Sequence, residues 1–193
     1  VFGYVEPLRI LCTRELQTSI RESFHAELRH AIAAHPFLAA HYDVGVDYIR
    51  GRNGTEFLFK GLRHSIGSIK STAAIDLTIV EEAEDVPEMS WEALLPTVMR
   101  TEKAEVWPIW NSRKRGSPVD KRFVLEPMPR SIVTHLNYND NPFFPAALDR
   151  LRVADQERLD DATYRWIWNG DYYERSKAQI FADKFVVREF EPG

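Results

Sequence analysis

The 193-residue sequence has little of several features that mark special classes of protein. Its single cysteine, Cys12, cannot form an internal disulfide, which excludes a disulfide-built secreted scaffold and suits a reducing compartment. It has only nine glycines and eleven prolines, so neither a collagen-like repeat nor a Pro/Gly-rich disordered chain is indicated. No apolar run reaches the ~18 residues of a membrane-spanning helix, and we expect no membrane association.

The residues that are present are typical of one globular domain. Hydrophobic residues make up 44% and charged residues 28% of the chain, and a chain of this length buries about 70% of its unfolded surface. The net charge of −4 argues against a surface that coats nucleic acid all over, so any DNA contact must be local. The one local candidate is a group of five cations: Arg113, Lys114, Arg115, Lys121 and Arg122. A solvated loop explains the same group without DNA.

Apolar patterns in the first half of the chain predict alternating strands and helices. The run at 8–13 predicts a buried strand, and apolar residues at every fourth position predict a helix over about 14–34, ended by Pro36. Residues 48–50 and 56–60 flank an Asn-Gly pair, which predicts a hairpin. The apolar run at 73–80 predicts a central buried strand.

The second half continues the alternation. We expect a helix capped by Ser90 and kinked or broken at Pro96. Two further strands are predicted at 105–111 and 131–137, two helices at 146–157 and 161–168, and a short terminal segment at 184–190. Strands that alternate with helices indicate an α/β domain with a mostly parallel sheet.

Two adjacent carboxylates, Glu81 and Glu82, follow the predicted central strand. In an open α/β sheet, ligands bind beyond the carboxyl ends of the strands. One carboxylate there can hold the Mg²⁺ that bridges nucleotide phosphates, and the other can polarise an attacking water. The alternative is an acidic helix start, because Glu84 and Asp85 follow and complement a helix dipole.

The segments 69–71, 73–84 (AAIDLTIVEEAE) and 90–97 resemble the Walker B region of phage terminase large subunits. They are similar to the branch whose hydrophobic strand ends in two glutamates rather than Asp-Glu. Four further segments resemble the family in the same order, at 8–17, 54–62, 110–113 and 137–142. Together they cover nearly the whole chain.

This resemblance implies a P-loop NTPase-like (ASCE) α/β fold and assigns roles to single residues. Glu81 takes the Walker B metal-ligand position and Glu82 that of the catalytic glutamate. Asn111 takes the coupling position that senses the γ-phosphate, with an ordinary strand-end cap as the alternative. Lys70 and Ser71 resemble a polar site near the nucleotide, with a plain loop as the alternative.

The resemblance also implies ligands and partners. These are ATP as substrate, Mg²⁺ as cofactor, double-stranded DNA, the terminase small subunit, the portal protein of the procapsid and further copies of the chain in a packaging ring. The expected compartment is the cytoplasm of the bacterial host.

One motif of a phosphate-loop ATPase is missing: the sequence contains no G-x-x-x-x-G-K-[ST] segment. We therefore expect residues 1–193 to be a partial ATPase domain, incomplete at its N-terminus, without the family's nuclease domain and with little activity alone. Two alternatives stay open. One is a non-catalytic DNA-binding or assembly module on a degenerate P-loop fold, and the other is a different ASCE ATPase such as a helicase.

Overall fold

A computed structural model describes residues 2–16, 20–63, 67, 69, 71–72 and 74–173. The chain forms two compact units. The first comprises residues 1–111 and 116–133, and the second comprises residues 112–115 and 134–193.

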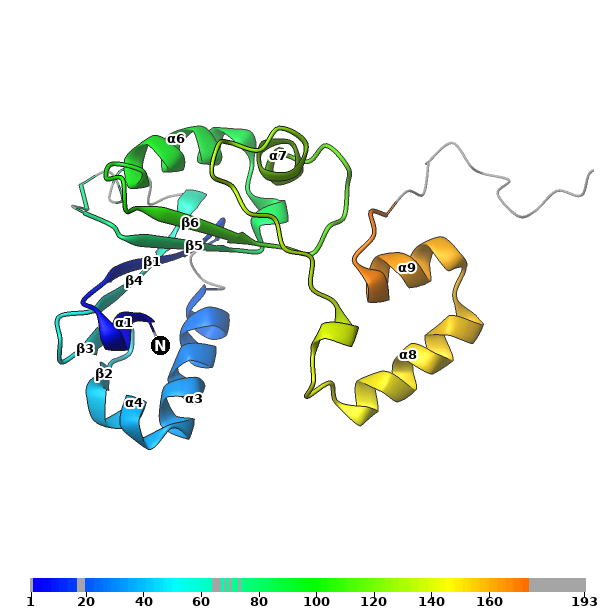
Figure 1. Ribbon diagram of the computed structural model, residues 1–193, viewed down its shortest axis with the longest axis horizontal. Coiled ribbons are helices and arrows are strands. Elements are labelled where there is room, and N and C mark those ends of the chain that lie inside the picture. The colour runs from blue at the N-terminus through cyan, green and yellow to red at the C-terminus, as the bar shows by residue number, and fades with distance from the viewer. Residues whose placement is uncertain are drawn as a thin grey trace, which may run out of the picture. The chain divides into compact units, whose positions relative to one another are not determined.

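A six-stranded sheet organises the first unit, in the order β2-β3-β4-β1-β5-β6 (Figure 1). Its strands are β1 (Arg9–Arg14), β2 (Tyr42–Val44), β3 (Ile49–Gly51), β4 (Glu56–Gly61), β5 (Leu77–Glu81) and β6 (Glu105–Ile109). The strands β4, β1, β5 and β6 are parallel, whereas β2 and β3 extend the sheet as antiparallel strands. The predicted mostly parallel α/β sheet is confirmed, with β1 inside it and flanked by β4 and β5.

Helices cover both faces of this sheet (Figure 1). On one face lie α6 (Glu88–Val98) and α7 (Pro118–Asp120), which continues into the π-helical turn η3 (Lys121–Leu125). On the other lie the π-helical turn η1 (Arg21–His25), α3 (Ala26–Ala34) and α4 (Pro36–His41). The described part of this unit also contains the short helix α1 (Phe2–Val5) and the 3₁₀ turn η2 (Ala83–Asp85).

The alternation of side chains along β1 divides the core into two layers. Leu11 packs with Trp91 and Leu94 of α6, whereas Ile10 and Cys12 belong to the cluster on the α3 face. Successive side chains of a strand point to opposite faces of the sheet. A central strand that is apolar at consecutive positions can therefore supply both layers, which explains the unbroken apolar run in β1.

The helix predicted over 14–34 is confirmed from Ile20 onward and wrong at its start. Arg14 is the last residue of β1, and residues 17–19 lie outside the described residues. Leu16, which the four-residue spacing assigned to the helix, is exposed. Sequence periodicity therefore placed the helix but missed that the strand continues to Arg14.

The predicted hairpin is confirmed, and the predicted central strand is shorter than expected. In the hairpin, β3 pairs antiparallel with β4 across a turn in which Gly54 adopts a φ of 94°. The central strand, β5, begins at Leu77, and Ala74, Ile75 and Asp76 precede it without strand structure.

The predicted start of the helix at Ser90 is wrong. Pro87 occupies the N-cap position of α6, and Ser90 is buried within the helix. Pro96 does not break the helix at its own position, because α6 continues through it to Val98. The expected inner face, which includes Trp91 and Leu94, is confirmed as buried.

The strand predicted at 131–137 is also wrong. These residues have no strand partner in the described part of the chain, and Ile132 and Leu136 are 91% and 77% exposed. A β-strand is stabilised by pairing with a neighbour, and the apolar pattern alone cannot supply one.

The strand expected at 105–111 is confirmed as β6 at the sheet edge, where Pro108 is tolerated. The segment 184–190 lies outside the described residues.

The described residues of the second unit contain a helical pair preceded by a capped 3₁₀ turn. Its elements are η4 (Tyr138–Asp140), α8 (Ala146–Arg158) and α9 (Asp161–Asn169), so the predicted helices at 146–157 and 161–168 are confirmed. Arg152 on α8 donates to the hydroxyl of Tyr164 on α9 at 3.0 Å. Trp168 donates its indole N–H to Asp155 at 3.2 Å. These hydrogen bonds fix α8 against α9.

Candidate functional site

Glu81 and Glu82 lie at the carboxyl end of β5, inside the parallel part of the sheet. Glu81 is the last residue of the strand and pairs in register with Ile109 of β6. Glu82 has a left-handed backbone, with φ 49° and ψ 45°. For a residue with a side chain this conformation costs roughly 1–3 kcal/mol, and such residues cluster at functional sites. The chain therefore turns sharply at the second glutamate.

The guanidinium of Arg14 faces both glutamates. Arg14 ends β1, which runs parallel to β5, so the carboxyl ends of the two strands meet at the same edge. Its Nε lies 3.5 Å from Oε2 of Glu81, and its Nη2 forms an ion pair with Oε1 of Glu82. Arg14 is 8% exposed, whereas the Glu82 side chain is 56% exposed. A buried cation thus stands against two carboxylates, one of which opens to solvent.

The hydroxyl of Ser23 contacts the same oxygen of Glu81 from another element. Ser23 Oγ donates to Glu81 Oε2 at 3.2 Å. Ser23 belongs to the π-helical turn η1, a geometry that occurs often at functional sites because it re-aims side chains. The Glu81 carboxylate is therefore held between an arginine and a hydroxyl.

A second ionic network begins at Glu15, next to Arg14. Glu15 is 7% exposed and accepts a hydrogen bond from Ser90 Oγ of α6 at 3.2 Å. Arg63, just after β4, lies 3.3 Å from the other carboxylate oxygen. A buried carboxylate is stable only when it is paired or hydrogen-bonded. Glu15 therefore ties β1, α6 and the segment after β4 together beside the glutamate pair.

The remaining predicted nucleotide residues have different positions. Asn111 is exposed and follows β6, at the same carboxyl end of the parallel strands as Glu81 and Glu82. Lys70 lies outside the described residues, whereas Ser71 is exposed in a turn closed by a 2.9 Å hydrogen bond from Thr72 N to Ile69 O.

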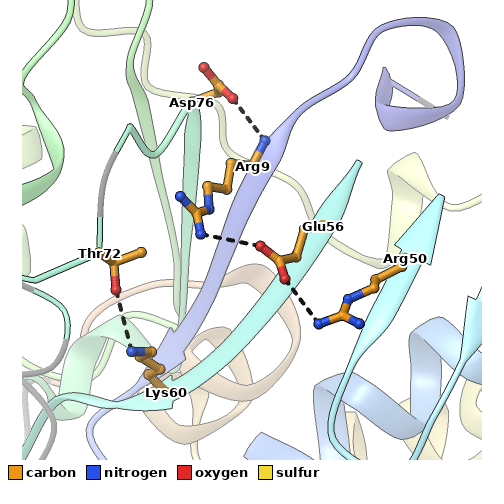
Figure 2. A network of polar contacts seen from close by, with 6 residues as sticks. All are labelled: Arg9, Arg50, Glu56, Lys60, Thr72 and Asp76. Atoms are coloured by element: carbon orange, nitrogen blue, oxygen red, sulfur yellow. Dashed lines mark hydrogen bonds and ion pairs between the residues drawn. The ribbon is translucent and has the colours of Figure 1, made fainter. Parts of the chain in front are cut away.

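Figure 2 shows what holds this turn to the sheet. Nζ of Lys60, near the carboxyl end of β4, donates to Thr72 Oγ1 at 3.3 Å. The turn that carries Ser71 is thus fixed near the strand edge where the glutamates lie.

The other contacts in Figure 2 lie near the amino end of β1 and stabilise the sheet. The Arg9 amide donates to Asp76 Oδ2 at 2.8 Å, and the Arg9 guanidinium lies 3.3 Å from Glu56. Arg50 lies 3.5 Å from the second oxygen of Glu56. This network joins β1, β3, β4 and the start of β5, far along β1 from Arg14.

The five cations proposed for DNA contact fall into both units of the chain. Arg113, Lys114 and Arg115 are exposed and belong to the second unit. Lys121 and Arg122 lie in η3 of the first unit, where they line an open hollow of about 470 Å³ together with Glu88 and Glu126. Arg122 forms an ion pair with Glu88. Acidic side chains thus partly balance the positive charge of this hollow.

Residue patterns alone missed five members of the two ionic networks around Arg14 and Glu15: Arg14, Ser23, Glu15, Arg63 and Ser90. For Arg14 a signal did exist, since it directly follows the strand predicted at 8–13, just as Glu81 follows the strand predicted at 73–80. Nothing in the sequence pairs Ser23 with Glu81, because 58 residues separate them.

Within the described ranges, no three or more His, Cys, Asp or Glu residues gather as a metal site. The same part of the chain contains no helix that is long and apolar enough to span a membrane.

The sheet order and the covering helices define the fold class. This is the α/β architecture of P-loop NTPase-like (ASCE) ATPase domains, and the comparisons with solved structures agree. The sequence matches the family model described as phage terminase large subunit over residues 4–171. The chain belongs to this family, so the predicted membership is confirmed. No curated protein matches it.

Solved structures of large terminases share the fold at low sequence identity. The large terminase of a thermophilic bacteriophage matches with a TM-score of 0.65 and 12% identity, over 83% of this chain and 39% of that one. The same terminase in complex with ADP matches with a TM-score of 0.62 and 12% identity, over the same shares of 83% and 39%. The large terminase ATPase domain of Thermus phage P74-26 matches with a TM-score of 0.58 and 14% identity, over 88% of this chain and 78% of that domain. The chain thus spans well under half of the longer terminase structure.

Proposed function

We propose that this chain is part of the ATP-hydrolysing motor of a phage terminase large subunit, which drives double-stranded DNA into the procapsid. The observation that carries the proposal is the glutamate pair at the end of β5, in a chain of this family and fold. A large terminase with this fold has been solved in complex with ADP and with ATP-gamma-S. Residues 1–193 then correspond to the Walker B and coupling regions of the ATPase domain.

Within this proposal, Glu81 and Glu82 divide the chemistry. Glu81 would hold Mg²⁺ directly or through water, since carboxylate oxygens suit this ion. The arrangement fits a cation, because the Arg14 guanidinium already stands against both carboxylates. Bound Mg²⁺ supplies charge neutralisation for the phosphates. Glu82, the more exposed carboxylate, orients water and accepts its proton at a side-chain oxygen.

The other predicted residues keep supporting roles in this proposal. Asn111 would sense the γ-phosphate at the edge next to Glu81, and Ser71 and Lys70 would lie near the nucleotide. Arg113, Lys114, Arg115, Lys121 and Arg122 would contact the DNA backbone. The partners would be the terminase small subunit, the portal protein and further copies of the chain in a ring, within the cytoplasm of the bacterial host.

Phosphate binding requires a backbone cradle and a lysine that these 193 residues do not contain. We therefore expect little ATP turnover from the chain alone. The first step of the test is to translate the genomic DNA upstream of the Val1 codon and look for a G-x-x-x-x-G-K-[ST] segment. The second is to express the chain joined to that segment and measure ATP hydrolysis.

In that protein, Glu82→Gln is expected to lower kcat by about 10²- to 10⁴-fold, because the amide cannot accept the proton of the attacking water. Arg9→Gln is the matched control: Arg9 lies on β1 with Arg14 but pairs with Glu56, and kcat should stay within about twofold. Full turnover by Glu82→Gln would contradict the catalytic role.

A second candidate function follows from the missing phosphate loop. It is a DNA-binding or assembly module that keeps the fold without hydrolysis. If the upstream DNA encodes no phosphate loop and DNA binding is indifferent to ATP, this function takes precedence. Binding should then weaken when Arg113, Lys114 and Arg115 are replaced together.

A further inference from the structure

We propose that Arg14 is a positioning residue that holds Glu81 and Glu82 before nucleotide binds and competes with a divalent cation for their oxygens. The inference rests on the proposed function of the glutamate pair, and it adds a residue and a competition which that function does not require. Its basis is the pair of contacts that one guanidinium makes with two carboxylates.

Because Arg14 is buried, its positive charge needs the two carboxylates nearby. A buried charge is costly unless an opposite charge compensates it. Arg14 is 8% exposed. Among the described residues, its ion-pair partners are Glu81 and Glu82. Its Nε is buried and lies 3.5 Å from Glu81 Oε2, too far for a good hydrogen bond. The guanidinium is thus held to Glu81 by charge, and its Nε–H group has no hydrogen-bond partner in the described part of the chain.

Arginine suits this place for a geometric reason. Its planar fork presents Nε and the Nη atoms in fixed directions, so one side chain can face two carboxylates. Here Nε faces Glu81 and Nη2 faces Glu82. Ser23 donates to the same Glu81 oxygen that Nε faces. Glu81 is thereby fixed from two sides, and Glu82 is drawn toward Arg14 despite its exposure.

The same contacts set up a competition. A divalent cation that binds Glu81 must approach oxygens already beside a positive charge, and like charges a few ångströms apart repel strongly in a partly buried site. Arg14 therefore weakens metal binding unless its guanidinium moves away from at least one carboxylate. Without metal, Arg14 keeps Glu81 and Glu82 in place. Its charge also lowers the affinity of these carboxylates for a divalent cation.

Metal affinity separates this role from that of an ordinary structural ion pair. We would titrate the 193-residue chain with Mn²⁺, a substitute for Mg²⁺, and follow free Mn²⁺ by electron paramagnetic resonance. Arg14→Gln removes the charge and is expected to tighten Mn²⁺ binding about tenfold. Arg9→Gln removes a charge at the other end of the same strand and should leave binding unchanged. Adding Glu81→Gln to Arg14→Gln should abolish the gain.

Arg14→Lys keeps the inference testable if Arg14→Gln does not fold, which circular dichroism would show. Lysine retains the charge but loses the fork, so it should contact one carboxylate at a time and tighten Mn²⁺ binding about threefold. A purely structural ion pair predicts looser or unchanged Mn²⁺ binding in both variants. No gain in the folded Arg14 variant, or an equal gain from Arg9→Gln, would overturn the inference.

The Mn²⁺ titration distinguishes a failure of the inference about Arg14 from a failure of the proposed function. If Glu81→Gln weakens Mn²⁺ binding but the Arg14 variants do not strengthen it, the inference fails and the metal role of Glu81 survives. If Glu81→Gln leaves Mn²⁺ binding unchanged, or if no variant binds Mn²⁺ at millimolar concentration, both fail.

Discussion

Arg14 and Glu15 are neighbours in sequence but belong to different ionic networks. Arg14 lies on the same face of β1 as Ile10 and Cys12, the face covered by α3. There it contacts Glu81 and Glu82. Glu15 has the parity of Leu11, on the face covered by α6, and it meets Ser90 of that helix. Arg14 ends the strand and Glu15 directly follows it, so the two adjacent charges reach opposite faces of the sheet.

The hydrogen bond between Ser90 and Glu15 should contribute measurably to stability. Ser90→Ala removes a donor from a buried carboxylate, which should lower the free energy of unfolding by about 1.5–3 kcal/mol. Urea denaturation followed by fluorescence would measure it. Ser131→Ala, at an exposed position, is the control and should change stability by less than about 0.5 kcal/mol. Equal stability of Ser90→Ala and the wild type would show that water replaces the hydroxyl.

At the scale of elements, the β3–β4 hairpin is held by its turn and by the chain start. Asn53 accepts from the Thr55 amide at 3.1 Å and donates to the Gly3 carbonyl at 2.9 Å. Thr55 Oγ1 also donates to the Gly3 carbonyl, at 2.5 Å. A Cβ on Gly3 would lie 2.7 Å from Thr55 Cγ2, so the close approach of α1 requires glycine. The turn therefore anchors α1 as well as joining two strands.

Gly54 is the residue of this turn most sensitive to substitution. Its φ of 94° is unfavourable for residues with a Cβ, so Gly54→Ala should cost roughly 1–2 kcal/mol although nothing lies within 4 Å of the added atom. Gly67→Ala is the control, because its Cβ also meets nothing and its φ is ordinary. Thermal unfolding of both variants would measure the difference. A loss of stability in Gly67→Ala as large as that in Gly54→Ala would contradict the backbone explanation.

At the scale of the whole molecule, Cys12 reports on the integrity of the sheet. It is fully buried in β1, and burial, together with the negative charge of Glu81, raises the pKa of its thiol well above the ordinary value of 9.0. In the unfolded chain the thiol ionises near that ordinary value. The unfolded state therefore binds fewer protons above pH 9, and stability falls as pH rises through this value.

The expected loss attributable to Cys12 between pH 8 and pH 10 is roughly 1 kcal/mol, and it should vanish in Cys12→Ala. The measurement is the free energy of unfolding at both pH values for the two proteins. Burial also raises the pKa of Tyr42, but this residue is common to both proteins and cancels in the comparison. An identical pH dependence in the two proteins would mean that the thiol ionises as readily in the folded chain as in the unfolded one.

Local patterns in the sequence were sufficient to predict many of the strands and helices. The apolar runs of β1 and β5 and the Asn53-Gly54 turn predicted much of the sheet, and strand ends singled out Glu81 and Glu82. Roles for these glutamates stay predictions. Local patterns succeed here because burial and turn conformation act within a few residues.

Contacts between residues that are distant in the sequence could not be predicted without the fold. Parallel pairing of β1 with β5 brings Arg14 to Glu81 and Glu82, and the packing of α6 brings Ser90 to Glu15. The strand predicted at 131–137 did not form for a related reason: an apolar pattern does not specify a pairing partner. Contacts between residues more than 50 positions apart depend on strand order and on which face a helix covers, and these are properties of the whole fold.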